Sequence, residues 1–396
     1  MFKIRQRFPA NKLEHIEAAV RTELAGCGVS IKPGARVAIA VGSRGIANLQ
    51  LIVLEVVAWV RQQRGEPFVV PAIGSHGGAT AEGQRCLLET YGIAETKVGA
   101  PIVSSMEVVE LGPDAFMDKT AHDADGTILI NRIKPHTSFH GPHESGLMKM
   151  IAIGLGKRSG AVAIHRRGVE GLRELMPRVA RRILERGNIL LGIAIVENAC
   201  DETLVVRAVP ASKIPEQDKL LLELARANMP CLPVPNLDVL IVDEIGKDIS
   251  GTGLDTNVVG RLRIAGQPEP SSPKINMIVI RDLSDASNGS AYGMGLADIT
   301  TRRVFQKIDW KATYENVFAS GFFERGKLPV VADTDDQALE WALRACEAIK
   351  PEEVRIVRIK NTLRLDSLLV SEAVRKEIAG RETIDVIGPV AIWEPL

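Results

Sequence analysis

The sequence predicts an α/β protein with two domains, each built on a mostly parallel sheet flanked by helices. Short apolar runs alternate with segments of helical periodicity, as in chains that pass from strand to strand through helices. The length of 396 residues exceeds what one small core needs. Three prolines in Pro230–Pro235 interrupt the pattern, which then starts again. We therefore expect a first domain at residues 1–230 and a second at 231–396, with the last twenty or so residues able to pack back on the first domain.

The first domain contains four apolar runs that are typical of buried parallel strands. They lie at residues 37–41, 68–73, 127–130 and 189–196. The spacing of apolar residues predicts a helix over 51–63, with one apolar face formed by Leu51, Leu54, Val57 and Val60. Thr80 is a suitable N-cap for a second helix, which we expect to end near Tyr91.

The second domain repeats the alternation of strands and helices. We expect strands at residues 237–242, 275–280, 354–359 and 387–393. A helix is predicted over 335–349.

Composition excludes several functional classes. The chain has 49 basic and 49 acidic residues and only 4% aromatic residues, so a nucleic-acid partner is not expected. The five cysteines form no CxxC pair, which argues against a zinc ribbon, an iron–sulfur site or a disulfide framework. No apolar stretch approaches the roughly 20 residues needed to span a bilayer. We expect a cytoplasmic enzyme without membrane contacts, and leave a homo-oligomer open.

Polar residues follow three of the predicted strands. Arg44 comes after the strand at 37–41, and His76 and His136 come after the next two strands. Because the carboxyl ends of parallel strands meet at one edge of a sheet, these side chains are expected to converge in one crevice. His136 opens a polar segment, 136–149, that also holds His140, His143 and Lys149, and His165 follows sixteen residues after Lys149. Histidine is the commonest metal ligand and the side chain best suited to proton transfer near neutral pH.

These motifs resemble the lactate racemase family, whose members use a nickel-pincer nucleotide. Gly74-Ser75-His76-Gly77-Gly78 is similar to the family's glycine-histidine loop after the second strand. The Pro135-His136 pair, followed by Ser145-Gly146-Leu147-Met148-Lys149, resembles its proline-histidine and lysine segment. The step from Lys149 to His165 agrees with the family's spacing, and residues 237–242, with Gly246 and 254–257, resemble the opening of its second domain.

The resemblance implies a site between the domains and a role for each matched residue. Lys149 would carry the cofactor, nickel bound to pyridinium-3,5-bisthiocarboxylic acid mononucleotide, with Gly77 and Gly78 beside it. His165 would complete the nickel coordination, which suits a soft, planar donor set. His76 and His136 would be the acid–base pair that inverts a 2-hydroxy acid, and Arg44 would hold its carboxylate. Separate biosynthetic enzymes would supply the cofactor.

The sequence departs from the family pattern in three places. Val41 stands where the family has an aspartate. The interval between His136 and Lys149 is longer and contains His140 and His143, each of which could replace His136 as the base or bind a polar substrate. Arg261 or Arg263 is a candidate for the family's substrate-binding residues of the second domain, which have no clean match. The substrate could therefore be a larger hydroxy acid, such as a sugar acid, instead of lactate.

Two other functions remain open from the residues alone. His136, His140 and His143 could form the zinc site of a hydrolase, although the prolines and glycine among them favour a loop. The chain could also be a non-catalytic homologue that binds an organic acid. The segment 154–160 superficially resembles a phosphate-binding loop, but it lacks the four-residue gap between its glycines.

Overall fold

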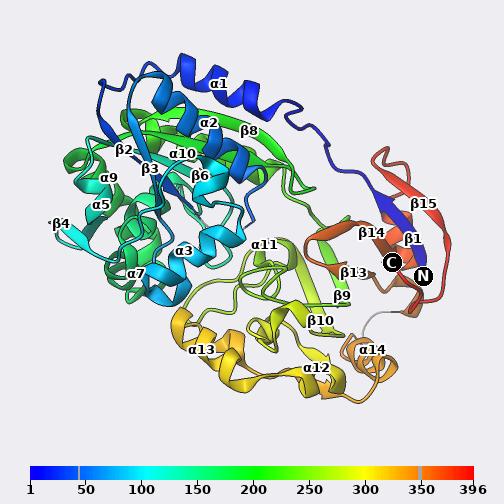
Figure 1. Ribbon diagram of the computed structural model, residues 1–396. Helices are drawn as coiled ribbons and strands as arrows, with labels where there is room; N and C mark the ends of the chain where they lie inside the picture. The colour runs from blue at the N-terminus through cyan, green and yellow to red at the C-terminus, as the bar shows by residue number, and fades with distance from the viewer. Residues whose placement is uncertain (43–44, 347–349) are drawn as a thin grey trace. The chain divides into compact units, whose positions relative to one another are not determined.

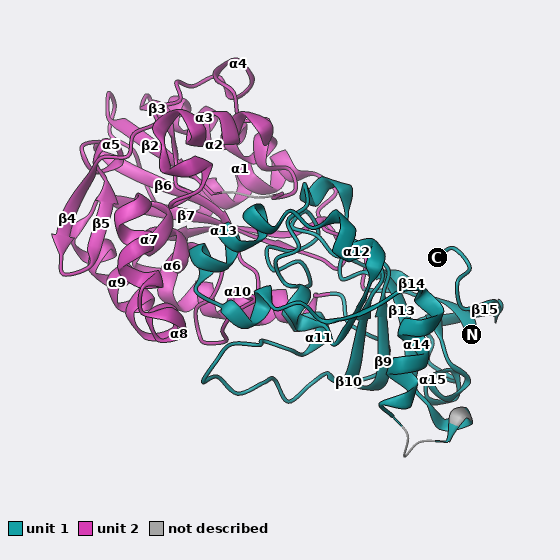
Figure 2. Ribbon diagram, turned by 90° about the horizontal axis from the view of Figure 1, so that it is seen from below, with its two compact units in different colours: residues 1–8, 230–396 teal, residues 9–229 magenta. Residues whose placement is uncertain are grey.

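The computed structural model describes residues 1–42, 45–346 and 350–396. The chain forms two compact units, one of residues 9–229 and one of residues 1–8 with 230–396 (Figure 2). Residues 1–8, which we expected in the first domain, cluster with the other unit. The reason is that β1 (Phe2–Gln6) pairs with two strands from the end of the chain.

The unit of residues 9–229 contains a five-stranded sheet in the order β3-β2-β6-β7-β8 (Figure 1). The first four strands are parallel and β8 is antiparallel to β7. The strands are β2 (Arg36–Val41), β3 (Glu66–Pro71), β6 (Gly126–Arg132), β7 (Ile189–Glu197) and β8 (Thr203–Pro210). The four expected strands are thus present, and β8 is an addition. A separate hairpin consists of β4 (Val108–Gly112) and β5 (Ala115–Asp118).

Helices cover both faces of this sheet. On one face, α1 (Ile16–Gly26) and α2 (Leu49–Gln62) share an apolar core with alternate residues of the strands. The predicted face of α2 is partly wrong: Val57 and Val60 are buried, but Leu54 is exposed. The buried side of α2 contains Ile52, Val53, Val56, Val57 and Val60.

On the other face, Gly192 of β7 leaves room for Leu147 of the short helix α6 (Leu147–Lys149), which contacts α10 (Ile214–Ala227). The helical path of α6 continues through a π-helical segment, Met150–Gly154. Further helical segments are η1 (Gly77–Ala79), α3 (Ala81–Thr90), α4 (Glu95–Val98), α5 (Lys119–His122), α7 (Lys157–His165), α8 (Gly168–Glu170), a π-helical turn (Gly171–Leu175), α9 (Met176–Arg186) and η4 (Ala211–Lys213).

The second unit has an eight-stranded sheet in the order β12-β11-β10-β9-β13-β14-β1-β15. The first five strands in this order, from β12 to β13, are parallel to their neighbours. The pairs β13–β14, β14–β1 and β1–β15 are antiparallel. The strands are β9 (Asn236–Val242), β10 (Lys274–Ile280), β11 (Ile299–Thr301), β12 (Val330–Ala332), β13 (Ile356–Asn361), β14 (Arg364–Val370) and β15 (Ile384–Pro389). The expected strand at 387–393 is therefore displaced toward the N-terminus, and β15 pairs with β1.

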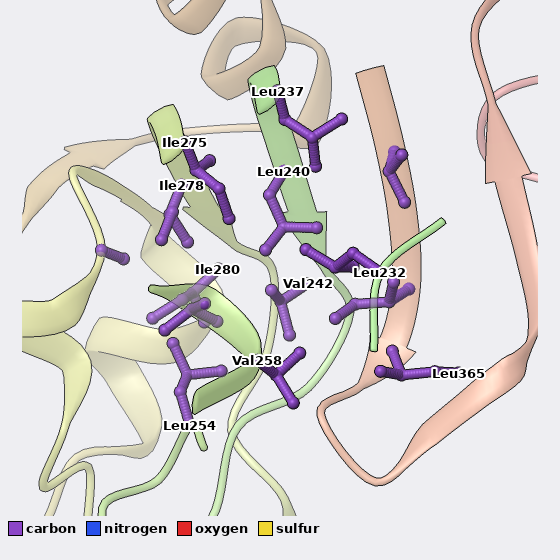
Figure 3. Packing of buried hydrophobic residues seen from close by; sticks show 14 of the residues in the cluster. Leu232, Leu237, Leu240, Val242, Leu254, Val258, Ile275, Ile278, Ile280 and Leu365 are labelled. Atoms are coloured by element: carbon purple, nitrogen blue, oxygen red, sulfur yellow. The ribbon is translucent and has the colours of Figure 1, made fainter. Parts of the chain in front are cut away.

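Two apolar clusters hold the second sheet. One contains Leu240, Val242, Ile278 and Ile280 of the central strands, with Leu254 and Val258 packed over them (Figure 3). On the opposite side, α14 (Asp335–Arg344) packs Ala338 and Ala342 against β9 and β10. The other helical segments of this unit are α11 (Thr256–Val259), η5 (Asp285–Ser287), η6 (Met294–Leu296), α12 (Arg302–Lys307), α13 (Trp310–Ser320), η7 (Phe323–Gly326), η8 (Pro351–Glu353) and α15 (Glu372–Glu377).

Candidate functional site

Two of the predicted site histidines follow strands that end at the same edge of the first sheet. Val41 at the end of β2 pairs with Pro71 of β3 on one side and with Ile130 of β6 on the other. His76 follows β3 and His136 follows β6, so both loops leave the carboxyl edge of the sheet. Arg44, which follows β2, lies outside the described residues.

The loop that carries His76 depends on glycines and on one buried amide. Gly74, Gly77 and Gly78 have φ of 64°, 64° and 67°, which is left-handed backbone that favours glycine. A Cβ on Gly77 would lie 2.5 Å from the carbonyl carbon of Gly83. The buried side chain of Gln84 donates through Nε2 to the carbonyl oxygens of Gly74, at 2.7 Å, and of His76, at 3.3 Å.

This loop packs on the helical segment that follows Lys149. The Gly74 N–H donates to the Gly154 carbonyl oxygen at 3.1 Å. Gly154 must be glycine, since a Cβ there would collide with the carbonyl oxygen of Ala72. The His76 loop and the Lys149 segment are therefore in direct backbone contact.

The loop that carries His136 is organised by a buried carboxylate, Glu144. Its side chain accepts hydrogen bonds from the backbone N–H of His136, at 2.6 Å, and of Gly141, at 3.0 Å. Arg226 of α10 lies 2.5 Å away, and His140 Nδ1 lies at 3.3 Å. Burial acts to raise the pKa of Glu144, but the hydrogen bonds from His140 and the two N–H groups outweigh it and the pKa is lowered.

The environment of the His136 ring selects its tautomer. The Ser138 N–H donates to His136 Nδ1 at 3.0 Å, so a neutral imidazole carries its proton on Nε2. The ring of Phe139 lies 4.7 Å from the imidazole, centroid to centroid. In this tautomer Nε2 is a donor and cannot accept a proton from a ligand.

Lys149 ends the first turn of a helix whose start is fixed by a second buried carboxylate. Asp218 of α10 accepts from the N–H groups of Leu147, at 2.6 Å, and Met148, at 3.3 Å. A Cβ at Gly146 would collide with the same carboxylate. Lys149 itself is half-buried. The π-helical turn that follows it is a rare geometry that is frequent at functional sites.

His165, at the end of α7, is close enough to Lys149 for the two charges to interact. Desolvation by the surrounding protein and, second, the charge of Lys149 lower the pKa of His165 to about 4, although the residue as a whole is exposed. At neutral pH its imidazole is therefore uncharged, which is the form that binds metal ions.

The three histidines of the expected zinc cluster have different environments. His143 is buried, and its Nδ1 lies 3.0 Å from Asp218 Oδ2, which favours a structural role. His140 is exposed beside Glu144, and His136 contacts Ser138. Across residues 1–42, 45–346 and 350–396, no three His, Cys, Asp or Glu side chains are grouped so that they could hold a metal ion. The zinc site is therefore not formed by these side chains.

The arginines proposed for substrate binding belong to the second unit. Arg261 is buried and donates to the carbonyl oxygens of Leu296, Ile275 and Asn276 and to Asp298, at 2.7–3.1 Å. These contacts give Arg261 a structural role. Arg263 reaches the same Asp298 at 3.3 Å and is more exposed.

Three residues that organise the site were not predicted from the sequence: Gln84, Glu144 and Asp218. A signal existed for Asp218, which stands on the buried stripe of α10 with Ile214, Leu221, Leu222 and Ala225. A carboxylate on an apolar stripe is rarely buried without partners. Glu144 lies in a loop without a periodic pattern, whereas Gln84 lies on α3, where Leu88, one turn later, shares its buried side.

Comparisons with known proteins bear on the fold. No family model matches the sequence, and no curated protein matches it significantly. The structure is similar to that of the lactate racemase apoprotein from Thermoanaerobacterium thermosaccharolyticum, with a TM-score of 0.50 and 13% sequence identity. The alignment covers 92% of this chain and 99% of the other. The two proteins share a mixed α/β fold with parallel-rich sheets flanked by helices. Helices long and apolar enough to cross a membrane are absent from the described residues.

Proposed function

We propose that this protein is a racemase or epimerase of a 2-hydroxy acid that uses a nickel-pincer nucleotide attached to Lys149. The observation that carries the proposal is the arrangement around this lysine. A buried carboxylate fixes its helix, the uncharged His165 lies within its electrostatic reach, and the His76 loop packs on the segment that follows it. The similarity in fold to a lactate racemase apoprotein supports the same assignment.

The residues present fit this cofactor better than a metal bound by protein alone. The pincer supplies three of the four nickel donors, so only one protein ligand is needed, and the neutral imidazole of His165 suits that position. A half-buried lysine beside it provides the amine for the covalent link. The absence of a grouped set of protein ligands among the described residues is compatible with such a site.

The chain's own residues would bind the substrate and move one proton. When bound, the nickel-pincer nucleotide would take up and return the hydride of the substrate's α-carbon. His76 and His136 would exchange the hydroxyl proton, one for each enantiomer. For His136 to accept it at Nε2, the Ser138 N–H would have to release Nδ1, so that the ring proton can move there. Arg44 would hold the carboxylate. Other enzymes would have to make the cofactor, so the protein from a host without them would be unmodified.

The experiment is to produce the protein together with the cofactor-making enzymes and to measure its intact mass and nickel content. We expect an adduct on the peptide that contains Lys149, with about one nickel per chain, and none in Lys149→Ala. Lys119→Ala is the matched control, because this exposed lysine pairs with its neighbour Asp123. Retained zinc without an adduct would instead indicate a hydrolase, and binding of an organic acid without either would indicate a non-catalytic homologue.

The two histidines are tested by the optical rotation of enantiopure 2-hydroxy acids, from lactate to sugar acids. His76→Ala and His136→Ala should each lower the rate of inversion by roughly 10²–10⁴-fold, the usual contribution of a general acid or base. The adduct on Lys149 should persist in both variants. Full turnover in both would remove the two histidines from the mechanism.

A further inference from the structure

Lys157 is the one fully buried lysine among the described residues, and the racemase proposal gives it no role. Its Nζ donates to the Pro71 carbonyl oxygen at 2.5 Å and to Gln84 Oε1 at 3.0 Å, and it lies 3.0 Å from Asp118 Oδ2. Lys157 and Asp118 are both 0% exposed. Desolvation lowers the pKa of Lys157, and the charge of Asp118 opposes this change. Because the ammonium points into the protein, Lys157 cannot act as the lysine of a phosphate-binding loop.

The ammonium determines which way the Gln84 amide points. An ammonium has three donors and no lone pair, so Gln84 must turn Oε1 toward Lys157. The Nε2 group is then directed at the carbonyl oxygens of Gly74 and His76. A flipped amide would set its oxygen against those two carbonyls and leave all of them without donors. Lys157 and the His76 loop are thus connected through one side chain.

The His76 loop needs such an external support because its own sequence does not rigidify it. Three of its residues, Gly74, Gly77 and Gly78, are glycines in left-handed backbone, and glycine loses the most conformational freedom on folding. Lys157 itself has φ of 52°, which is unfavourable for a residue with a side chain. The strained backbone and the buried charge both place this ammonium against Pro71 and Gln84, at the base of the loop.

We infer that Lys157 is a positioning residue that holds His76 at a fixed place relative to Lys149, by orienting Gln84. The inference rests on the proposed function for the importance of His76, although the contact itself does not. Lys157 follows Lys149 in the chain, after the π-helical turn, and is the first residue of α7. It therefore connects the segment that would carry the cofactor to the loop that would carry the base. A displacement of the base by about 1 Å is enough to lower a rate by roughly 10²-fold.

The test compares Lys157→Met and Gln84→Glu with two controls. Gln84→Glu keeps the partner of Lys157 but removes the donor to Gly74 and His76. Val53→Ala, in the buried face of α2, lowers stability without touching the loop, and Lys119→Met removes an exposed lysine. The first measurement is hydrogen exchange of peptides that cover residues 74–79 in the unmodified protein.

Both test variants should accelerate exchange at residues 74–79 by about tenfold or more, whereas Val53→Ala and Lys119→Met leave it unchanged relative to the rest of the unit. In the cofactor-loaded protein, kcat should fall by roughly 10–100-fold with KM within about twofold and with the Lys149 adduct intact. If Lys157→Met does not fold, the same measurements on Gln84→Glu test the inference.

Unchanged exchange at 74–79 in the folded variants would overturn the inference, as would a loss of kcat equal to that of Val53→Ala. These results are separable from failure of the proposed function. A wild-type protein with no adduct and no racemase activity would refute that function, while hydrogen exchange would still report on the link from Lys157 to His76.

Discussion

The loops that carry His76 and His136 leave the same edge of one sheet, but they are held by interactions of opposite polarity. The His76 loop presents carbonyl oxygens to a donor, Gln84, which is backed by the buried ammonium of Lys157. The His136 loop presents N–H groups to an acceptor, the buried carboxylate of Glu144, which is backed by Arg226. The first loop bends through glycines, whereas the second contains prolines.

The difference shows that hydrogen bonds of either polarity to the loop backbone can help to place a site histidine. In each loop a buried polar side chain bonds to the backbone, and the His136 ring is contacted in addition by the Ser138 N–H and by Phe139. The charges that support the two loops differ in sign. Different substitutions and different ranges of pH should therefore destabilise each loop.

Removal of Glu144 should be the most damaging change. Glu144→Ala leaves Arg226 and two N–H groups without their buried acceptor, and we expect a loss of about 3 kcal/mol in the free energy of unfolding. Urea denaturation followed by hydrogen exchange of peptides from 9–229 measures it. Glu223→Ala is the matched control, because Glu223 pairs with the same arginine at the surface. An equal effect of the two substitutions would contradict a special role for the buried carboxylate.

The glycine loop can be tested with two neighbouring residues of the same conformation. Gly77→Ala should cost about 3 kcal/mol, because left-handed strain adds to a collision with the Gly83 backbone. Gly78→Ala meets no atom within 4 Å and should cost only about 1 kcal/mol. The same denaturation experiment compares them. If both cost the same, the close packing of η1 on α3 would not be what holds the loop.

Acidification should weaken the His136 loop. The pKa of Glu144 is lowered from 4.5 in the folded protein, so the unfolded chain binds its proton first as the pH falls. The stability that Glu144 contributes is complete above about 4.5 and is lost below it, as the pH passes through the folded pKa. The difference in unfolding free energy between wild type and Glu144→Gln, measured from pH 7 to pH 3, should shrink below that point. A difference that stays constant would show that Glu144 is not ionised in the folded state.

The smallest expected effect is a change in the pKa of His165, which with Lys149 would bind the cofactor. In the unmodified protein, the His165 imidazole should titrate near pH 4, well below the ordinary value of 6.5. Lys149→Met should raise this pKa by a part of the shift only, because desolvation is the larger cause. The histidine proton resonances followed by NMR across pH 3–8 provide the measurement, with Lys119→Met as control. An unchanged titration in Lys149→Met would place the two residues apart.

The sequence predicted the parts of the fold that depend on local periodicity. The strands at 37–41 and 127–130 were found because buried parallel strands are continuous apolar runs. The pairing of β1 with β14 and β15 was missed, since it joins residues at opposite ends of the chain. The misplaced Leu54 on α2 has a related cause: ten of the fourteen residues there are apolar, so the pattern distinguishes the buried side poorly.

In the site, too, residues marked by local sequence patterns were predicted, whereas residues that act through long-range contacts were not. Strand ends and motif spacing indicated His76, His136, Lys149 and His165, and their roles stay predictions. The residues that hold them were not predicted, because Asp218 reaches Leu147 across seventy-one positions and Lys157 reaches Gln84 across seventy-three. The structural role of Arg261 likewise follows from carbonyl oxygens that no side-chain pattern reveals.

The hydrogen bond from Ser138 to His136 has a kinetic consequence. Nε2 can accept a proton only after the ring changes tautomer, which requires the Ser138 N–H to release Nδ1. An imidazolium that returns the proton from Nε2 also carries a proton on Nδ1, so under the proposed function both directions of the inversion would require Ser138 to release the ring. Mirror-image acids have equal energies, so kcat/KM must be identical for both. The mobility of Ser138 would therefore affect turnover of both enantiomers.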